Sequence, residues 1–365
     1  MGAEPPLEAL PRLSALAGGP LWVKRDDLLP LAMGGNKIRQ LQPIFGRAQA
    51  AGSDTILITG AVQSNYCRLA AAAAAKLGMA AEVQGEERVP GVDATYRGSG
   101  NVLVQQLLGV RGHAYPEGED EAGADAALAA RAAALRAEGR RPYVIPLGPG
   151  HPPLGALGYV EAALALADEI AAAGIGEAHL AVASGSGMTH AGLLFGLRAI
   201  GASNPVTGVC VRRPAAAQAT RIAAHSDGIA ELLGIANPVA PADIRLTDRF
   251  LAPGYGRLNL PAARALLAAA RCEVLLLDPV YTAKAMAGAL NLAGTLGGRP
   301  VVFIHTGGTP ALFAYAPELT RLARSVVGGC ATAIHPQRST DDNGAATAAD
   351  PPWVTRGAGP TEGGA

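Results

Sequence analysis

Short apolar runs alternate along the chain with longer segments in which apolar residues recur every three or four positions. The runs predict strands, and the longer segments, many of which end at a glycine, predict helices. Because strands alternate with helices, we expect an α/β protein with parallel sheets that helices cover on both faces. The predicted strands cover residues 21–26, 55–59, 80–84, 113–116, 142–147, 179–184, 206–212, 273–278 and 301–307. The predicted helices cover residues 37–52, 64–78, 101–109, 121–139, 158–174, 191–201, 216–234 and 261–271, and a loop and a further helix follow each of the last two strands.

A segment rich in glycine and proline, residues 148–158, interrupts this alternation and marks the expected crossing between two domains. Residues 41–154 would form a small α/β domain. Residues 1–40 would pack with residues 155–325 in a larger one, so that each domain is built on an open, twisted parallel sheet. Residues 326–365 are rich in Gly, Ala, Thr and Pro without periodicity, and we expect this tail to be disordered.

Composition narrows the classes of function. The chain has 365 residues, enough for two domains, with 30 basic and 30 acidic side chains and so no net charge. Zero net charge removes the electrostatic argument for binding nucleic acid or an anionic membrane. No apolar run approaches the roughly 20 residues of a membrane-spanning helix, and the first residues lack a secretory pattern. The four cysteines lie far apart, without a metal-binding pair, so we expect a cytoplasmic protein that uses no metal.

The chain offers only four lysines for chemistry that needs an amine. Lys37 follows two glycines at the start of a predicted helix, where a cation is disfavoured, and such a place helps to lower the pKa of a Schiff-base amine. Lys76 lies at a helix C-terminus, Lys24 stands beside two aspartates, and Lys284 falls on a helix after Tyr-Thr. Lys37 is therefore the best candidate, although the pattern alone also fits a solvated lysine after a turn.

The segment SGSGMTHAG, residues 184–192, joins a strand to a helix through crowded glycines. Backbone amides and the positive end of the helix would converge there, which suits a phosphate. The spacing fits neither a Walker loop, nor a dinucleotide fingerprint, nor a nucleophile elbow. A tight turn that needs glycine is the alternative. The candidate phosphate-binding residues are Gly185, Ser186, Gly187, Met188 and Thr189.

Small polar residues also follow other predicted strands. Gln63, Ser64 and Asn65 stand at the start of a helix, which suits a carboxylate but equally an ordinary helix cap. Carboxyl ends of parallel strands are where open sheets bind ligands. The further candidates at such ends are Tyr281, Thr282, His305 and Thr306, and Tyr255 lies between two glycines.

Taken together, several segments and the order in which they occur resemble one family. These segments are KRDD, MGGNK, QSN, PYVIP, GALGYVEAA, SGSGMTHAG, GYG, LDPVYTAKAMAG and HTGG. They resemble the tryptophan-synthase-type (fold type II) pyridoxal-phosphate enzymes, and among these the D-cysteine desulfhydrase and 1-aminocyclopropane-1-carboxylate (ACC) deaminase group. The resemblance covers residues 5–324. It implies a cytoplasmic homodimer that acts on a small amino acid.

The resemblance also implies roles for the residues. Lys37 would hold pyridoxal 5′-phosphate covalently, Asn65 would bond the 3′ oxygen of the cofactor, and Thr306 would face its ring nitrogen. The loop from Gly185 to Thr189 would bind the phosphate. Gln63, Ser64 and Asn65 would bind the substrate, with Tyr255 and Tyr281 beside it. The implied catalytic residues are Lys37, Ser64, Tyr255 and Tyr281.

Thr282 favours one branch of this group. ACC deaminases carry a glutamate at this position, facing the ring nitrogen, and a neutral hydroxyl instead suits an easier β-elimination. We therefore expect β-elimination from D-cysteine to pyruvate, hydrogen sulfide and ammonia. The alternatives are ACC deaminase, which forms 2-oxobutyrate and ammonia, elimination from L-cysteate or D-serine, and a pyridoxal-phosphate-binding protein without turnover.

Three positions depart from the pattern of the group. Gln40 replaces a second lysine that touches the phosphate, Tyr66 replaces a common histidine, and Met188 stands where a small residue is usual. Gln40 bears on the affinity for the cofactor. Tyr66 and Met188 bear on the choice of substrate.

Overall fold

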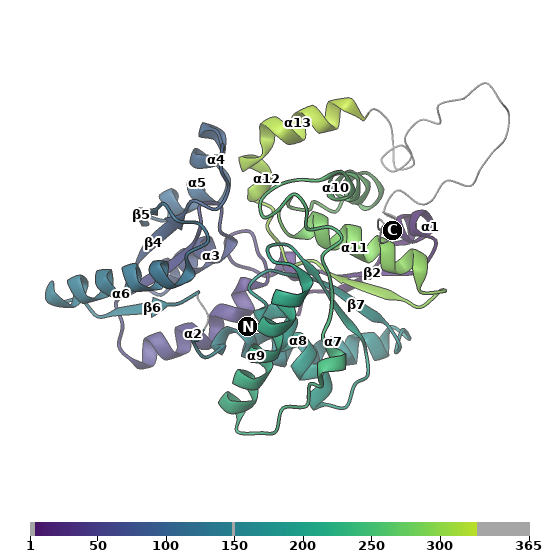
Figure 1. Ribbon diagram of the computed structural model, residues 1–365, viewed down its shortest axis with the longest axis horizontal. Helices are drawn as coiled ribbons and strands as arrows, with labels where there is room; N and C mark the ends of the chain where they lie inside the picture. The colour runs from purple at the N-terminus through teal and green to yellow at the C-terminus, as the bar shows by residue number, and fades with distance from the viewer. Residues whose placement is uncertain (1–3, 148–149, 327–365) are drawn as a thin grey trace, which may run out of the picture.

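The computed structural model describes residues 4–147 and 150–326, which form two sheets (Figure 1). The smaller sheet has the strand order β5-β4-β3-β6, and all its neighbours are parallel. The larger sheet has the order β1-β2-β10-β7-β8-β9, and only the β1–β2 pair is antiparallel. The bounds are β1 (Leu7–Ala9), β2 (Leu21–Lys24), β3 (Thr55–Ala61), β4 (Ala80–Glu86), β5 (Arg111–Tyr115), β6 (Pro142–Ile145), β7 (His179–Ser184), β8 (Val206–Cys210), β9 (Arg245–Thr247) and β10 (Val301–Ile304).

Helices connect the strands and cover the sheets. Between β3 and β6 lie α3 (Asn65–Lys76), α4 (Ala94–Gly98), α5 (Gly100–Leu107) and α6 (Glu121–Ala137), and α2 (Lys37–Ala50) precedes them. The helices of the larger half are α1 (Pro11–Ala17), α7 (Leu157–Ala172), α8 (Met188–Ala199), α9 (Ala215–Leu233), α10 (Leu260–Glu273), α11 (Thr282–Thr295), α12 (Ala311–Ala314) and α13 (Ala316–Ser325), with short 3₁₀ turns at Asp26–Leu28, Leu154–Ala156 and Pro241–Asp243.

The larger sheet is buried on both faces because its strands alternate between two cores. Val301 and Phe303 of β10 pack with α1, α10 and α11, whereas Val302 and Ile304 of the same strand pack with α7 and α8. This period of two, with apolar residues on both faces, is what a parallel strand between two helical layers requires. The predicted fold class is therefore confirmed.

The strands of the smaller sheet all come from residues 55–145, and those of the larger sheet precede residue 25 or follow residue 178. The two sets of elements lie on opposite sides of Figure 1. The exact domain boundaries stay a prediction. The predicted disordered tail lies, after Val326, outside the described residues. Among those described, no helix is both long and apolar enough to cross a membrane.

One predicted strand is wrong. Helix α10 continues to Glu273, and residues 274–278 run as irregular backbone that pairs with no strand. Val274 adopts a left-handed conformation, φ 55°, and ends the helix, after which Leu275 and Leu277 are buried. An apolar run marks a buried extended segment, but it does not show whether a neighbouring strand is there to pair with it. The pattern also missed the short elements β1, α1, α4 and β9.

Candidate active site

A cavity lies where the carboxyl ends of strands from both sheets meet. The segments that follow β3, β7, β8 and β10 all contribute to its wall, together with the start of α2. Of the residues that the sequence predicted for the site, all line this cavity except Gln63, Thr282 and His305. The arrangement follows the general rule that open parallel sheets bind ligands beyond the carboxyl ends of their strands.

Lys37 is the only one of the four lysines that lines the cavity. Burial lowers its pKa to about 8. Its Nζ lies 3.2 Å from Gln40 Oε1 and 5.5 Å from the centre of the Tyr66 ring. The other lysines are engaged elsewhere or exposed: Lys24 Nζ pairs with Glu169 at 2.6 Å, and Lys284 Nζ donates to two backbone carbonyls. The cavity therefore holds one amine, partly neutral near physiological pH.

The glycine loop, residues 185–189, joins β7 to α8. Gly187 has φ 95°, which glycine adopts without strain, and the first amides of a helix have no partner within it. The carbonyl oxygens of the loop are occupied from behind. Arg213 Nη1 donates to Gly185 O at 3.2 Å and Arg221 Nε donates to Ser186 O at 2.9 Å. The loop thus offers amides and the positive end of α8 to an anion.

Thr189 ties this loop to the lysine. Its Oγ1 accepts hydrogen bonds from Asn36 Nδ2 and from Gln40 Nε2, both at 2.8 Å. Gln40 in turn contacts Lys37 through its Oε1. The lysine and the glycine loop are therefore held in one hydrogen-bonded unit.

The start of α3 brings two predicted residues to the cavity and turns a third away. Ser64 caps the helix by accepting from Cys67 N at 3.1 Å, and Asn65 Oδ1 accepts from Asn101 Nδ2 at 2.9 Å. Gln63 does not line the cavity, because its Nε2 donates to the carbonyls of Tyr96 and Ser99 and its Oε1 accepts from Asn101 N. Gln63 holds the α4–α5 segment in place, and its contact with substrate stays a prediction.

Tyr255 and Tyr281 stand together at the cavity wall. Their hydroxyls share a hydrogen bond of 2.5 Å, and their rings meet edge to face with centres 5.8 Å apart. Burial raises the pKa of both phenols, so both carry their protons at neutral pH. Lys284 supports the segment that carries Tyr255 by donating to Gly254 O at 2.7 Å.

Thr282 is placed differently from what the sequence suggested. Its Oγ1 donates to Asp278 Oδ2 at 2.6 Å and accepts from Asp278 N at 2.7 Å, and Thr282 does not line the cavity. Thr282 is the first residue of α11, and its backbone N also donates to Asp278 Oδ2 at 2.9 Å. Asp278 and Thr306 line the cavity instead, so the hydroxyl of Thr282 reaches the cavity only through Asp278.

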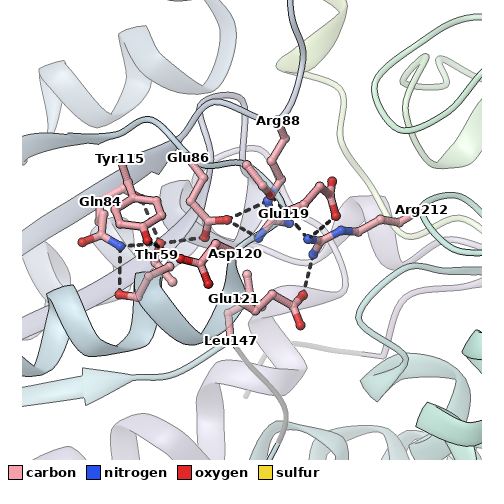
Figure 2. Close-up of polar contacts among 12 residues, drawn as sticks. Thr59, Gln84, Glu86, Arg88, Tyr115, Glu119, Asp120, Glu121, Leu147 and Arg212 are labelled. Atoms are coloured by element: carbon pink, nitrogen blue, oxygen red, sulfur yellow. Dashed lines mark hydrogen bonds and ion pairs between the residues drawn. The ribbon is translucent and has the colours of Figure 1, made fainter.

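Several charged residues of the wall were not predicted (Figure 2). Glu121, from α6, pairs with Arg212 at 2.6 Å, with Arg213 at 2.5 Å and with Arg221 at 3.1 Å. Arg88 pairs with Glu86 at 2.6 Å. Arg88 follows β4 and Arg212 follows β8, so the rule on strand ends that singled out Thr306 could have found them. Within the described part of the chain, no group of three or more His, Cys, Asp or Glu is arranged to hold a metal.

Lys37 opposite an anion-binding glycine loop defines the class: an α/β enzyme that binds a phosphorylated carbonyl cofactor through an amine. The chain belongs to the family described as pyridoxal-phosphate dependent enzyme, whose pattern it matches over residues 2–307. The residues present fit this cofactor, since amine, loop and Thr306 all line one cavity. The predicted cofactor and family are thus confirmed.

The relatives are consistent with this assignment. The chain is 43% identical over 324 residues to D-cysteine desulfhydrase of Salmonella choleraesuis, covering 87% of this chain and 96% of that protein, and equally similar to the protein of that name from Salmonella paratyphi C. A solved ACC deaminase homologue is 34% identical with a TM-score of 0.78, covering 88% of this chain and 94% of the other. Threonine deaminase isoform 2 of Solanum lycopersicum, 16% identical with a TM-score of 0.58, shares the fold.

Proposed function

We propose that the protein is a pyridoxal-phosphate-dependent lyase that removes the β-substituent of a small amino acid, with D-cysteine as the reference substrate. The observation that carries this proposal is the single amine of the cavity, Lys37, with its pKa lowered to about 8 and tied through Gln40 to the glycine loop. The names of the relatives add support, because the Salmonella proteins are D-cysteine desulfhydrases.

The elimination step breaks two bonds of the substrate, and the later addition of water breaks the bond between Cα and nitrogen. Cα loses a proton, and the Cβ–S bond breaks with both electrons leaving on sulfur as hydrosulfide. The remaining enamine takes up water and gives pyruvate and ammonium. Bound pyridoxal phosphate supplies the electron sink for the charge that develops at Cα.

The protein's own groups orient the substrate and move the proton. Lys37 binds the cofactor and, once free, accepts the Cα proton, for which a pKa near neutrality is well suited. Ser64 and Asn65 bind the substrate carboxylate at the positive end of α3, and the Ser64 hydroxyl is the second candidate carrier of the proton. Tyr255 and Tyr281 would border the substrate, the loop at residues 185–189 would bind the phosphate of the cofactor, and Thr306 would contact its ring.

The test compares two lysines. Lys37→Ala should abolish both the visible absorbance of the lysine-bound cofactor and pyruvate release from D-cysteine. Lys76→Ala, at an exposed position of α3, should leave both unchanged. A Lys37→Ala enzyme with full activity would overturn the assignment. Release of 2-oxobutyrate from ACC, in place of pyruvate from D-cysteine, would instead favour the deaminase that the solved ACC deaminase homologue suggests.

We also propose that the enzyme works in the cytoplasm as a homodimer, on the strength of its resemblance to the D-cysteine desulfhydrase group. Sedimentation equilibrium of the purified protein should then give twice the mass of one chain. A mass equal to that of one chain at every concentration would refute the dimer.

A further inference from the structure

Two buried arginines, Arg88 and Arg212, line the cavity beside the tyrosine pair. Their side chains are only 6% and 5% exposed. Val89, next to Arg88, packs in one apolar cluster with Tyr255 and Tyr281. Burial raises the pKa of Tyr255, and the charges of Arg88 and Arg212 both act against that rise. The positive charges of the two guanidinium groups therefore reach the part of the cavity whose wall is formed by Tyr255 and Tyr281.

The hydrogen-bonding capacity of these arginines is not used up. Arg88 donates from Nε and Nη2 to one oxygen of Glu86, at 2.8 and 2.6 Å, and within the described chain its Nη1 makes no hydrogen bond. Arg212 bonds Glu121 and Glu119, but its buried Nε has no partner among the described residues. A buried donor without a partner is costly, and such a group at a cavity wall is satisfied when a ligand supplies an acceptor.

The charge balance of the wall also favours an anion. In the ion-paired cluster at the wall, four arginines (Arg88, Arg212, Arg213 and Arg221) pair with three glutamates (Glu86, Glu119 and Glu121), which leaves one positive charge within the cluster. Figure 2 shows Arg88, Arg212 and the three glutamates. Glu119 is 73% exposed, so its pair with Arg212 is screened by water and easily exchanged. Arg213 and Arg221 are engaged with the carbonyls of the glycine loop. The excess charge thus lies in the cluster around Glu121, where Arg212 is the arginine whose second partner, Glu119, is exposed.

The α-carboxylate of the substrate does not account for this charge. On the proposed function, that carboxylate binds at the start of α3, where Ser64 and Asn65 line the cavity. The positive charge of the arginines therefore calls for a second anionic group on the substrate. A guanidinium fork binds a sulfonate or phosphate through two oxygens at once, whereas a thiol or hydroxyl offers a single atom.

Resting on the proposed β-elimination, we propose that Arg88 and Arg212 select substrates whose β-carbon carries a tetrahedral oxyanion, namely a sulfonate or a phosphate ester. The bond from Cβ to this group breaks with both electrons leaving on the departing sulfite or phosphate. The Cα proton is lost to the protein, and water converts the enamine to pyruvate and ammonium. The guanidinium groups bind the oxyanion before and after it leaves.

The first experiment measures kcat/KM of the holoenzyme for both enantiomers of cysteate and of O-phosphoserine, with D-cysteine as reference. Release of sulfite or of phosphate identifies which oxyanion is used. In Arg88→Gln and in Arg212→Gln, kcat/KM for the oxyanion substrate should fall about tenfold or more, the usual effect of losing a charge-assisted hydrogen bond. The value for D-cysteine should change by less than about threefold. Arg97→Gln, at a half-exposed position paired with Glu87, is the matched control and should change neither.

A second variant guards against misfolding. Arg88→Gln leaves the Glu86 carboxylate buried without its partner, which can destabilise the fold. The double variant Glu86→Gln/Arg88→Gln removes both charges and should show the same loss toward the oxyanion substrate. Inhibition by 3-sulfopropanoate, which has no amino group and cannot react, reports binding alone. Its inhibition constant should rise about tenfold in the arginine variants, whereas that of propanoate should not.

The outcomes separate this proposal from the proposed function. Normal turnover of D-cysteine, with neither turnover of any oxyanion substrate nor inhibition by 3-sulfopropanoate, would overturn the oxyanion site and leave the lyase standing. Equal losses for D-cysteine and for the oxyanion substrate would also overturn it, since the arginines would then have a structural role. Pyruvate from no amino acid at all would refute the lyase itself.

Discussion

The pKa of Lys37 makes a quantitative prediction about how the apoprotein takes up its cofactor. Only a neutral amine attacks the aldehyde of pyridoxal phosphate. Burial lowers the pKa of this lysine to about 8, from 10.5 for an ordinary lysine. At pH 7 the buried amine is neutral in about one molecule in ten, and an ordinary lysine in about one in three thousand. Lys37 should therefore react about 300-fold faster at pH 7 than its exposed equivalent would.

The assay follows the visible absorbance after the cofactor-free protein is mixed with pyridoxal phosphate between about pH 6 and pH 10.5. The apparent rate constant should rise with pH, reach half of its limit near pH 8, where half of Lys37 is neutral, and be nearly level by about pH 9.5. N-acetyl-lysine amide, measured in parallel, corrects for ionisation of the cofactor itself. Its rate should keep rising up to about pH 10.5.

A rate that still rises in parallel with the free lysine above about pH 9.5 would refute the reasoning, since it would show that the cavity does not disfavour the ammonium form. Lys284 offers an internal comparison. Burial lowers its pKa to about 8 as well, but it lies outside the cavity and bonds to the carbonyls of Leu251 and Gly254. Lys284→Met should leave the pH at which the rate levels off unchanged.

Two further predictions concern the framework of the site. Thr282→Val removes a buried donor to Asp278, and should lower the free energy of unfolding in urea by about 1–3 kcal/mol while leaving the visible spectrum of the holoenzyme in place. A changed spectrum with unchanged stability would mean that Thr282 contacts the cofactor after all. Gly187→Ala places a Cβ 3.0 Å from Ile222 and forces a left-handed conformation, so it should weaken cofactor binding in equilibrium titration. Gly201→Ala, also left-handed but in open space, should cost stability alone, and equal cofactor affinity in both variants would contradict this account.

The larger elements could be predicted from sequence because burial on both faces leaves an unbroken apolar run. Strands β3, β7 and β10 are of this kind, and each was placed within a few residues. The three-residue strands β1 and β9 carry too few positions for a pattern. The segment at residues 274–278 was taken for a strand since its leucines are buried, but strand pairing depends on a neighbour that a single segment does not reveal.

The same limit applies to the site. Residues beyond strand ends could be predicted because parallel strands bring their carboxyl ends to one edge, and Thr306, which follows β10, does line the cavity. Tyr281 lines it too, although the segment before it pairs with no strand. The direction of a side chain is set by its partners. Gln63 and Ser64 are adjacent in sequence, yet Gln63 binds the backbone of the α4–α5 segment while Ser64 lines the cavity. Arg88 lines the cavity as well, and its ion pair with Glu86 forms only in the folded chain.

The site needs a neutral amine at Lys37 and positive charge at the glycine loop, and Gln40 allows different residues to supply the two. Its Oε1 accepts from Lys37 and its Nε2 donates to Thr189, so it links the amine to the glycine loop without adding charge. Burial alone lowers the pKa of Lys37, with no second cation required nearby. Positive charge at the loop comes from Arg213 and Arg221, which hold its carbonyl oxygens. Because guanidinium groups stay charged at every physiological pH, the loop keeps its attraction for phosphate at the pH where Lys37 loses its proton.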